Sequence, residues 1–190
     1  MPRLLEIIAS TRPGRVGLPV GRWFQEAAIA HGGFEVTVAD LAEIRLPFMD
    51  EPNHPRLRRY SHQHTRDWSA TVEAADAVVI VMPEYNYGYT APIKNALDYL
   101  FEEWQHKPLG LVGYGGVAAG TRAQQLLRPV VTALRMVVAS QSVLIPYVTR
   151  FLADDGSFVP DEEITRSAKA MLDELLVLHG ALAPLRPART

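Results

Sequence analysis

Short β-rich apolar runs alternate with segments of helical spacing along the chain, and this alternation limits the possible folds more than any other feature. The five runs cover residues 4–9, 34–38, 77–82, 109–113 and 137–145. Because they are almost continuously apolar, they predict strands buried on both faces, as in a parallel sheet covered by helices. The expected class is therefore α/β, with a doubly wound five-stranded parallel sheet and helices on both faces.

Three apolar stripes with helical spacing predict helices between and after these strands. The stripes are Val20, Phe24, Ala27 and Ala28; Ile93, Leu97, Leu100, Phe101 and Trp104; and Ile164, Ala168, Met171, Leu172 and Leu175. Pro160 and Asp161 stand before the last stripe and form a helix start signal. Pro187 breaks any helix near the end, so residues 184–190 are expected to be a frayed tail.

Length and composition narrow the class of protein. The 190 residues fit one domain, residues 1–190, and the absence of cysteine excludes disulfides, thiolate metal sites and thiol catalysis. The net charge of -2 and the pI of about 6.3 give no general attraction to nucleic acid or anionic membranes. Glu6 interrupts the first apolar run, which therefore predicts neither a signal peptide nor a spanning helix. We expect a cytoplasmic protein with no nucleic-acid or membrane partner.

Residues 50–66 form the one long polar stretch, with four arginines and three histidines, and lead into a helix predicted around residues 68–74. The stretch is either an ordinary solvated connection or a lid that binds an anionic second substrate. No cysteine or carboxylate stands at a familiar ligand spacing from His54, His62 and His64, so no metal site is expected.

Ligands of open parallel sheets bind beyond the carboxyl ends of the strands, and the loop after the first strand suits a phosphate. Residues 10–17 contain Ser10, Arg12, Arg15 and Val16 and lead into a helix N-terminus. Free backbone N–H groups and the helix dipole favour an anion there, and arginines add charged hydrogen bonds. The glycine spacing fits neither a Walker A loop nor G-x-G-x-x-G. A polar surface turn is the alternative interpretation.

The loops after the third and fourth strands suit a flat ring. Residues 83–92 carry three tyrosines, and the expected ring-binding residues are Pro83, Glu84, Tyr85, Asn86 and Gly88. Aromatic faces and edge hydrogen bonds bind a heteroaromatic ring, although these tyrosines also suit interface packing. A proton-donor role for Glu84 is weighed against capping of a neighbouring segment. In the next loop, Gly115 and Gly116 follow Tyr114 and would allow positive φ and close backbone approach.

Together these segments resemble the NADPH-dependent FMN reductase family, flavodoxin-like enzymes that include quinone and azo reductases. The resemblance covers about residues 3–148. It is carried by Ser-Thr-Arg-Pro-Gly-Arg at 10–15, Pro-Glu-Tyr-Asn at 83–86, Lys-Asn-Ala-Leu-Asp-Tyr at 94–99, Glu-Trp at 103–104, Lys-Pro at 107–108 and Tyr-Gly-Gly at 114–116.

The resemblance implies an FMN-dependent oxidoreductase that moves hydride from NADPH or NADH to the flavin and then to a quinone, an azo compound, free flavin or a similar acceptor. The flavin carries this chemistry, so no catalytic side chain is expected. Ser10, Arg12 and Arg15 match the flavin-phosphate loop. Pro83 to Asn86 with Gly88, and Tyr114 to Gly116, match the loops at the ring. The family works as dimers or tetramers with the flavin near the interface, where Tyr99, Phe101 and Trp104 would fit, as they would in a core.

Other functions remain open on the sequence alone. An FMN-binding electron carrier or redox-sensing module would use the same loops without steady turnover, although such carriers are commonly more acidic than this chain. A nicotinamide-only dehydrogenase would use Asp40, at the end of the second strand, to bind a ribose. The physiological acceptor is open, and the arginines of residues 56–66 favour NADPH over NADH only weakly.

Overall fold

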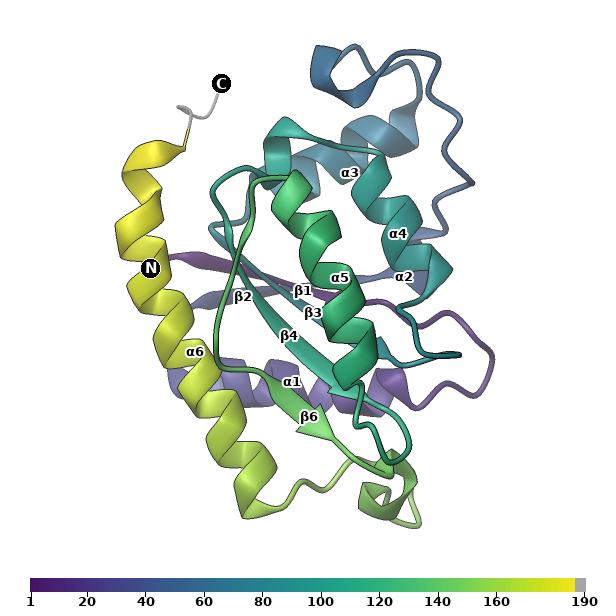
Figure 1. The fold of residues 1–190 in the computed structure, drawn as a ribbon, viewed down its shortest axis with the longest axis vertical. Coiled ribbons are helices and arrows are strands. Elements are labelled where there is room, and N and C mark those ends of the chain that lie inside the picture. Colours follow the sequence, from purple (N-terminus) through teal and green to yellow (C-terminus); the bar gives the residue numbers. More distant parts are fainter. Residues whose placement is uncertain (187–190) are drawn as a thin grey trace.

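The computed structural model describes residues 1–186 and contains one parallel sheet (Figure 1). The long strands are β1 (Arg3–Ile8), β2 (Glu35–Asp40), β3 (Ala77–Pro83) and β4 (Pro108–Tyr114). The short strands β5 (Val137–Val138) and β6 (Val143–Ile145) both pair with β4. The strand order is β2-β1-β3-β4-β5, and every pairing is parallel. The predicted flavodoxin-like class is confirmed.

The single fifth strand predicted for residues 137–145 is wrong, because this stretch is divided into β5 and β6. The carboxylate of Glu174 accepts hydrogen bonds from the backbone N–H of Ser140 at 2.8 Å and of Gln141 at 2.7 Å. These N–H groups therefore bond a side chain of helix α6 (Glu162–Leu182) instead of a neighbouring strand. The apolar pattern of the sequence does not predict these hydrogen bonds to Glu174.

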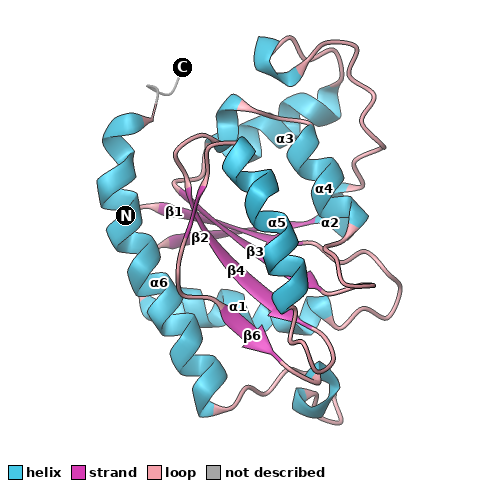
Figure 2. Ribbon diagram, viewed as in Figure 1, coloured by secondary structure: helices cyan, strands magenta, loops and turns pink. Residues whose placement is uncertain are grey.

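Helices cover both faces of the sheet (Figure 2). The helices α1 (Gly17–His31) and α6 lie on one face, and α3 (Gln63–Glu73), α4 (Ala91–Asp98) and α5 (Thr121–Ala133) lie on the other. The short α2 (Leu41–Ile44) follows β2. Asp161 caps α6 by accepting from the N–H of Ile164 at 2.8 Å, as the start signal predicts.

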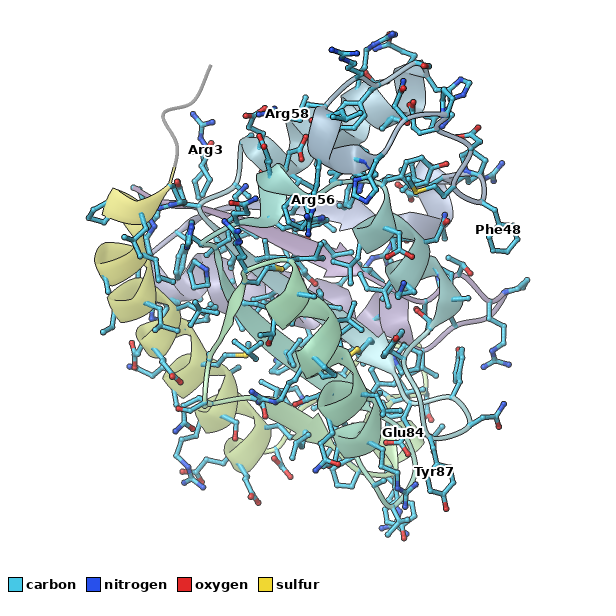
Figure 3. All side chains as sticks on the ribbon, turned by 45° about the horizontal axis from the view of Figure 1, so that its top comes forward. Arg3, Phe48, Arg56, Arg58, Glu84 and Tyr87 are labelled. Atoms are coloured by element: carbon cyan, nitrogen blue, oxygen red, sulfur yellow. The ribbon has the colours of Figure 1, made fainter. Side chains whose placement is uncertain are left out.

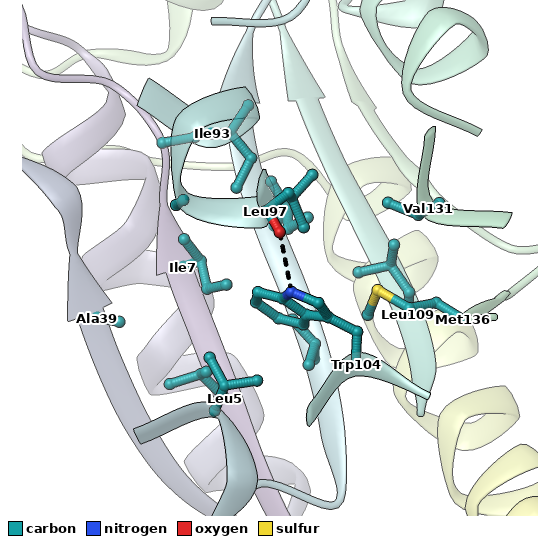
Figure 4. Close-up of a cluster of buried hydrophobic side chains, with 14 of the residues drawn as sticks. Leu5, Ile7, Ala39, Ile93, Leu97, Trp104, Leu109, Val131 and Met136 are labelled. Atoms are coloured by element: carbon teal, nitrogen blue, oxygen red, sulfur yellow. Dashed lines mark hydrogen bonds between the residues drawn. The ribbon is translucent and has the colours of Figure 1, made fainter. Parts of the chain in front are cut away.

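The apolar stripe from Ile93 to Trp104 does not form one helix. After α4 ends at Asp98, a separate 3-10 turn, η2 (Glu102–Trp104), follows. Tyr99 and Trp104 are fully buried, and the indole N–H of Trp104 donates to the carbonyl of Leu97 at 3.2 Å (Figure 4). These two aromatics therefore belong to the core, and are not available to an interface.

Part of the segment 50–66 is held near the amino-terminal ends of β3 and β4. The segment includes a 3-10 turn, η1 (Pro55–Leu57), and the first residues of α3, which begins earlier than predicted. The fully buried carboxylate of Glu103 accepts from the hydroxyls of Tyr60 and Ser69, both at 2.7 Å, and lies 3.5 Å from Nε of Arg58. This cluster anchors Arg58 and Tyr60 near the amino-terminal end of β4.

The end of the described chain is also anchored. After α6, a 3-10 turn, η4 (Ala183–Leu185), leads to Arg186, whose guanidinium contacts Oδ1 of Asp76 at 3.1 Å. The expected frayed tail is therefore wrong for residues 184–186, and residues 187–190 lie outside the described part. Among the described helices, none is long and apolar enough to span a membrane.

Candidate functional site

Three loops meet at the carboxyl ends of β1, β3 and β4, and hydrogen bonds connect them. The N–H of Ala9 donates to the carbonyl of Val81 at 2.9 Å, and the buried hydroxyl of Thr90 donates to the carbonyl of Ala9 at 2.7 Å. The N–H of Glu84 donates to the carbonyl of Tyr114 at 2.9 Å. The predicted site residues therefore lie on one rim of the sheet.

The loop after β1 contains a tight turn that exposes Arg12. The N–H of Arg15 donates to the carbonyl of Arg12 at 3.1 Å, with Pro13 and Gly14 between them. Gly14 has φ +67°, so this is the arrangement of a type II turn, which requires positive φ at its third residue. The Arg12 side chain is exposed, and it forms no ion pair within residues 1–186.

The start of α1 lies directly behind this turn and offers free N–H groups. Val16 provides no side-chain cap, and the first turn contains no acidic residue. A Cβ on Gly17 would lie 2.0 Å from Oγ of Ser10 and 2.4 Å from the hydroxyl of Tyr114, so only glycine fits there. Both hydroxyl oxygens are buried and have no hydrogen-bond partner among the described residues. Unpaired donors, an uncapped helix start and a free cation fit a phosphate group.

Arg15 has a different role from the one expected. Its guanidinium forms a bidentate ion pair with Asp40, in which one contact is 2.6 Å. It also donates to the carbonyl of Ser10 at 2.6 Å. The hydrogen bonds that Arg15 donates to the Asp40 carboxylate raise the pKa of Arg15 above its ordinary value. Asp40 in turn caps α2 by accepting from the N–H of Ala42 at 3.0 Å. Arg15 therefore fastens the loop to β2, and Asp40 is not free to bind a ribose.

The loop after β3 is a two-residue hairpin. Tyr85 and Gly88 exchange backbone hydrogen bonds of 3.0 and 2.9 Å, and the two residues between them, Asn86 and Tyr87, have φ of 48° and 71°. The left-handed conformation therefore falls on these two residues and not on Gly88, where a Cβ would meet only an ordinary contact at 3.7 Å. Tyr87 is 66% exposed. A bulky residue with positive φ is unusual and indicates a constraint.

Arg122, at the start of α5, supplies that constraint. Its guanidinium lies 4.0 Å from the ring centre of Tyr87. Its N–H and guanidinium donate to the carboxylate of Glu84 at 3.1 and 2.8 Å. Glu84 therefore caps a neighbouring segment, which was the plainer of its two expected roles. Figure 3 shows Glu84 and Tyr87 close together on the rim.

The loop after β4 presents backbone to the rim. Neither Gly115 nor Gly116 has positive φ, contrary to the expectation; that conformation falls on Ala119 and Gly120. A Cβ on Gly116 would meet nothing within 4 Å, so the rim is open at this point. The Tyr114 side chain points toward the start of α1, and burial raises the pKa of its phenol above the usual value.

Sequence reasoning missed Thr90 and Arg122, which join the loops. Arg58 pairs with Glu73 at 2.9 Å near the amino-terminal ends of the strands, away from the rim (Figure 3). The sequence signal for Arg122 was its position directly after a glycine-rich loop. In the described part of the chain, no group of three His, Cys, Asp or Glu side chains is placed to hold a metal ion.

Comparisons with known proteins agree with this geometry. The model of the NADPH-dependent FMN reductase family matches residues 2–150. An NAD(P)H-dependent FMN reductase of Schizosaccharomyces pombe is 39% identical over 127 residues, which cover 66% of this chain but only 64% of that relative's length. An FMN-dependent NADPH-azoreductase of Staphylococcus aureus is 27% identical over 175 residues, covering 90% of this chain and 92% of the azoreductase.

A solved structure shows the same fold. FerB, a flavoenzyme NAD(P)H:(acceptor) oxidoreductase from Paracoccus denitrificans, superposes with a TM-score of 0.76 and 22% identity, covering 96% of this chain and 99% of FerB. The matched family segment includes the three loops of the rim, where the unpaired hydroxyls and the aromatic hairpin lie. The chain belongs to the NADPH-dependent FMN reductase family.

Proposed function

We propose that the protein is an FMN-dependent oxidoreductase that uses NAD(P)H to reduce a small electron acceptor. The observation that carries the proposal is the meeting of a phosphate cradle and an aromatic hairpin on one rim. An unpaired Ser10 hydroxyl and an exposed Arg12 lie at the uncapped start of α1. Tyr85 and Tyr87 are exposed on the neighbouring loop. This arrangement fits the phosphate and the flat ring of one flavin mononucleotide.

In this proposal the chain binds and orients FMN. The flavin, when bound, supplies the hydride chemistry. Ser10, Arg12 and the α1 N–H groups hold the phosphate. The edge of the ring is contacted by the backbone of residues 83–88 and of Gly115 and Gly116. The Glu84–Arg122 pair keeps the two ring loops at a fixed separation, which is the preorganisation that orientation requires.

The free space at the rim bears on which acceptors can reach the ring position. Tyr87 is largely exposed and Gly116 has free space beside it, so a second flat molecule has access to the ring position. We propose quinones, azo compounds and free flavin as acceptors. A homodimer that works in the cytoplasm, where NAD(P)H is supplied, is part of the same proposal.

The test is the pattern of steady-state kinetics with NADPH and a soluble quinone. A single flavin position must meet the nicotinamide and the acceptor in turn, so parallel double-reciprocal lines are expected. The purified protein should also release FMN on denaturation. Protein that neither contains nor takes up FMN would refute the proposal. A flavin-containing protein with negligible turnover would instead be an electron carrier.

A further inference from the structure

A second pair of tyrosine and arginine lies on the other side of the loop after β4 from Tyr87 and Arg122. Tyr147 follows β6, and the guanidinium carbon of Arg150 lies 4.3 Å from the centre of its ring. Because β4 pairs with β3 on one side and with β6 on the other, the loop after β4 separates the two pairs. Tyr87 is 66% exposed and Tyr147 is 43% exposed. Two exposed tyrosines, each in contact with a guanidinium, therefore flank this loop.

Backbone hydrogen bonds hold the segment after β6 against the loop after β4, and Figure 1 shows the two side by side. The N–H of Tyr147 donates to the carbonyl of Gly116, and that of Val148 donates to the carbonyl of Gly115, both at 3.1 Å. Tyr147 has φ of 46°, so it is a second bulky residue in the left-handed conformation. Tyr147 is thus one hydrogen bond away from the backbone that we propose to contact the edge of the ring.

The segment that carries Arg150 is anchored in the core. The N–H of Arg150 donates to the carbonyl of Tyr147 at 2.8 Å. The ring of the next residue, Phe151, lies 5.9 Å from that of Phe158, which is buried and lies 5.1 Å from the ring of Trp23 in α1. The backbone at Arg150 is therefore fixed before any ligand binds.

The charge of Arg150 is free for a ligand. Within residues 1–186 its guanidinium forms no ion pair, whereas Arg122 is paired with Glu84 at 2.8 Å. Stacking on a tyrosine uses one face of a guanidinium and leaves the N–H groups at its edge for other partners. A planar molecule with a carboxylate or a sulfonate would meet an aromatic surface and a charged donor at the same place.

We propose that Arg150, held on the Tyr147 ring, selects planar electron acceptors that carry a carboxylate or sulfonate group. The inference rests on the proposed function and adds a preference among its acceptors. The acceptor lies at the open backbone of Gly116, where a Cβ would meet nothing within 4 Å, and its anionic group accepts from Arg150. Tyr147 is a positioning residue, because it acts through Arg150.

The test compares naphthoquinone sulfonate with unsubstituted naphthoquinone as acceptors for the FMN-containing protein, with NADPH as the donor. Loss of an exposed ion pair in Arg150→Gln should lower kcat/KM for the sulfonate about fivefold and leave kcat/KM for the unsubstituted quinone unchanged. Arg150→Lys retains the charge and should restore most of the preference. Arg59→Gln is the matched control and should change neither value, since Arg59 is exposed and lies near the amino-terminal end of β4.

Two further measurements separate a charge effect from a structural one. Raising the ionic strength should lower kcat/KM of the wild type for the sulfonate and not for the neutral quinone, and Arg150→Gln should lose most of this dependence. Naphthalenesulfonate, which accepts no electrons from the protein, should bind about fivefold more weakly to Arg150→Gln, measured by calorimetry. Tyr147→Asn should have the same effect, because it removes the ring under Arg150 and keeps a residue that tolerates positive φ.

Three outcomes would overturn the inference. Equal losses with both quinones in Arg150→Gln would show that Arg150 only supports the loop. An unchanged preference together with unchanged binding of naphthalenesulfonate would show that Arg150 meets no acceptor. A lower molar mass for Arg150→Gln than for the wild type would show that a second copy of the chain covers this pair. A protein that contains FMN but reduces neither quinone would refute the proposed function, and the binding of naphthalenesulfonate would still decide the role of Arg150.

Discussion

Arg12 and Arg15 lie on the same loop and differ in their environments. Arg15 is 12% exposed and bound to Asp40, whereas Arg12 is exposed and without an ion pair in the described residues. A cation that already neutralises a buried carboxylate gains little from a second anion, since moving it would leave that carboxylate unpaired. We therefore propose the phosphate role for Arg12, with Arg15 positioning the loop.

Replacing Arg12 should separate phosphate binding from ring binding. Loss of a charged hydrogen bond costs about 1.5–3 kcal/mol, so Arg12→Ala should weaken FMN about 10- to 150-fold. Riboflavin, which has no phosphate, should bind as before. Titration of flavin fluorescence with both ligands measures this. Arg15→Ala is the control: besides any effect on flavin binding, it should lower the free energy of unfolding, because it breaks the ion pair with Asp40. Equal losses of FMN and riboflavin affinity in Arg12→Ala would show that Arg12 only supports the loop.

Gly17 should tolerate no side chain. A Cβ there would lie 2.0 Å from Oγ of Ser10, and overpacking of this kind costs about 1–3 kcal/mol. Gly17→Ala should lower the free energy of unfolding by that amount, measured by urea denaturation, and weaken FMN. Gly180 of α6 has nothing within 4 Å, so Gly180→Ala should instead stabilise the protein by up to about 1 kcal/mol through helix propensity. The prediction fails if both variants change stability in the same direction.

At the scale of elements, the hairpin after β3 and the start of α5 act as one unit through Arg122. Removing this side chain leaves the Glu84 carboxylate without its guanidinium partner and the Tyr87 ring without its cation. Arg122→Ala should therefore weaken FMN and riboflavin by the same factor, about fivefold, as expected from a stacking contact of ~1 kcal/mol. Arg56→Ala is the matched control, since Arg56 lies 4.4 Å from the ring centre of Phe101, away from the rim. A loss confined to FMN would contradict the assignment.

The elements also show how far sequence reasoning reaches. Four strands, the starts of α1 and α6 and the three rim loops were predictable, because apolar period and turn residues are local signals. The division of the fifth strand was not, since it depends on Glu174, which is distant in sequence. The same reason explains Arg15, whose partner Asp40 belongs to another strand. A sequence shows which residues are charged, whereas long-range pairing decides which charges remain free for a ligand.

At the scale of the whole molecule, one carboxyl group connects stability to pH. Glu6 lies in the middle of β1, fully buried, and its carboxylate oxygens have no hydrogen-bond partner among the described residues. Its strand neighbours are Val38 and Val79, and Gly21 of α1 faces it. Burial raises the pKa of Glu6 to about 9, with no charge or hydrogen bond to oppose the shift. The protein therefore folds with this side chain protonated.

This protonation should make the protein less stable as the pH rises. Between the ordinary carboxyl pKa of 4.5 and about 9, the unfolded chain has lost the proton that the folded chain retains, so folding takes up a proton. From this group alone, the free energy of unfolding should fall by up to about 1.4 kcal/mol per pH unit in that window. Glu6→Gln, which does not ionise, should remove that slope, and Glu26→Gln, at an exposed glutamate of α1, should retain it. Urea denaturation at several pH values from 5 to 8 gives the three slopes. Identical slopes for Glu6→Gln and the wild type would mean that water reaches the Glu6 carboxylate in the folded protein.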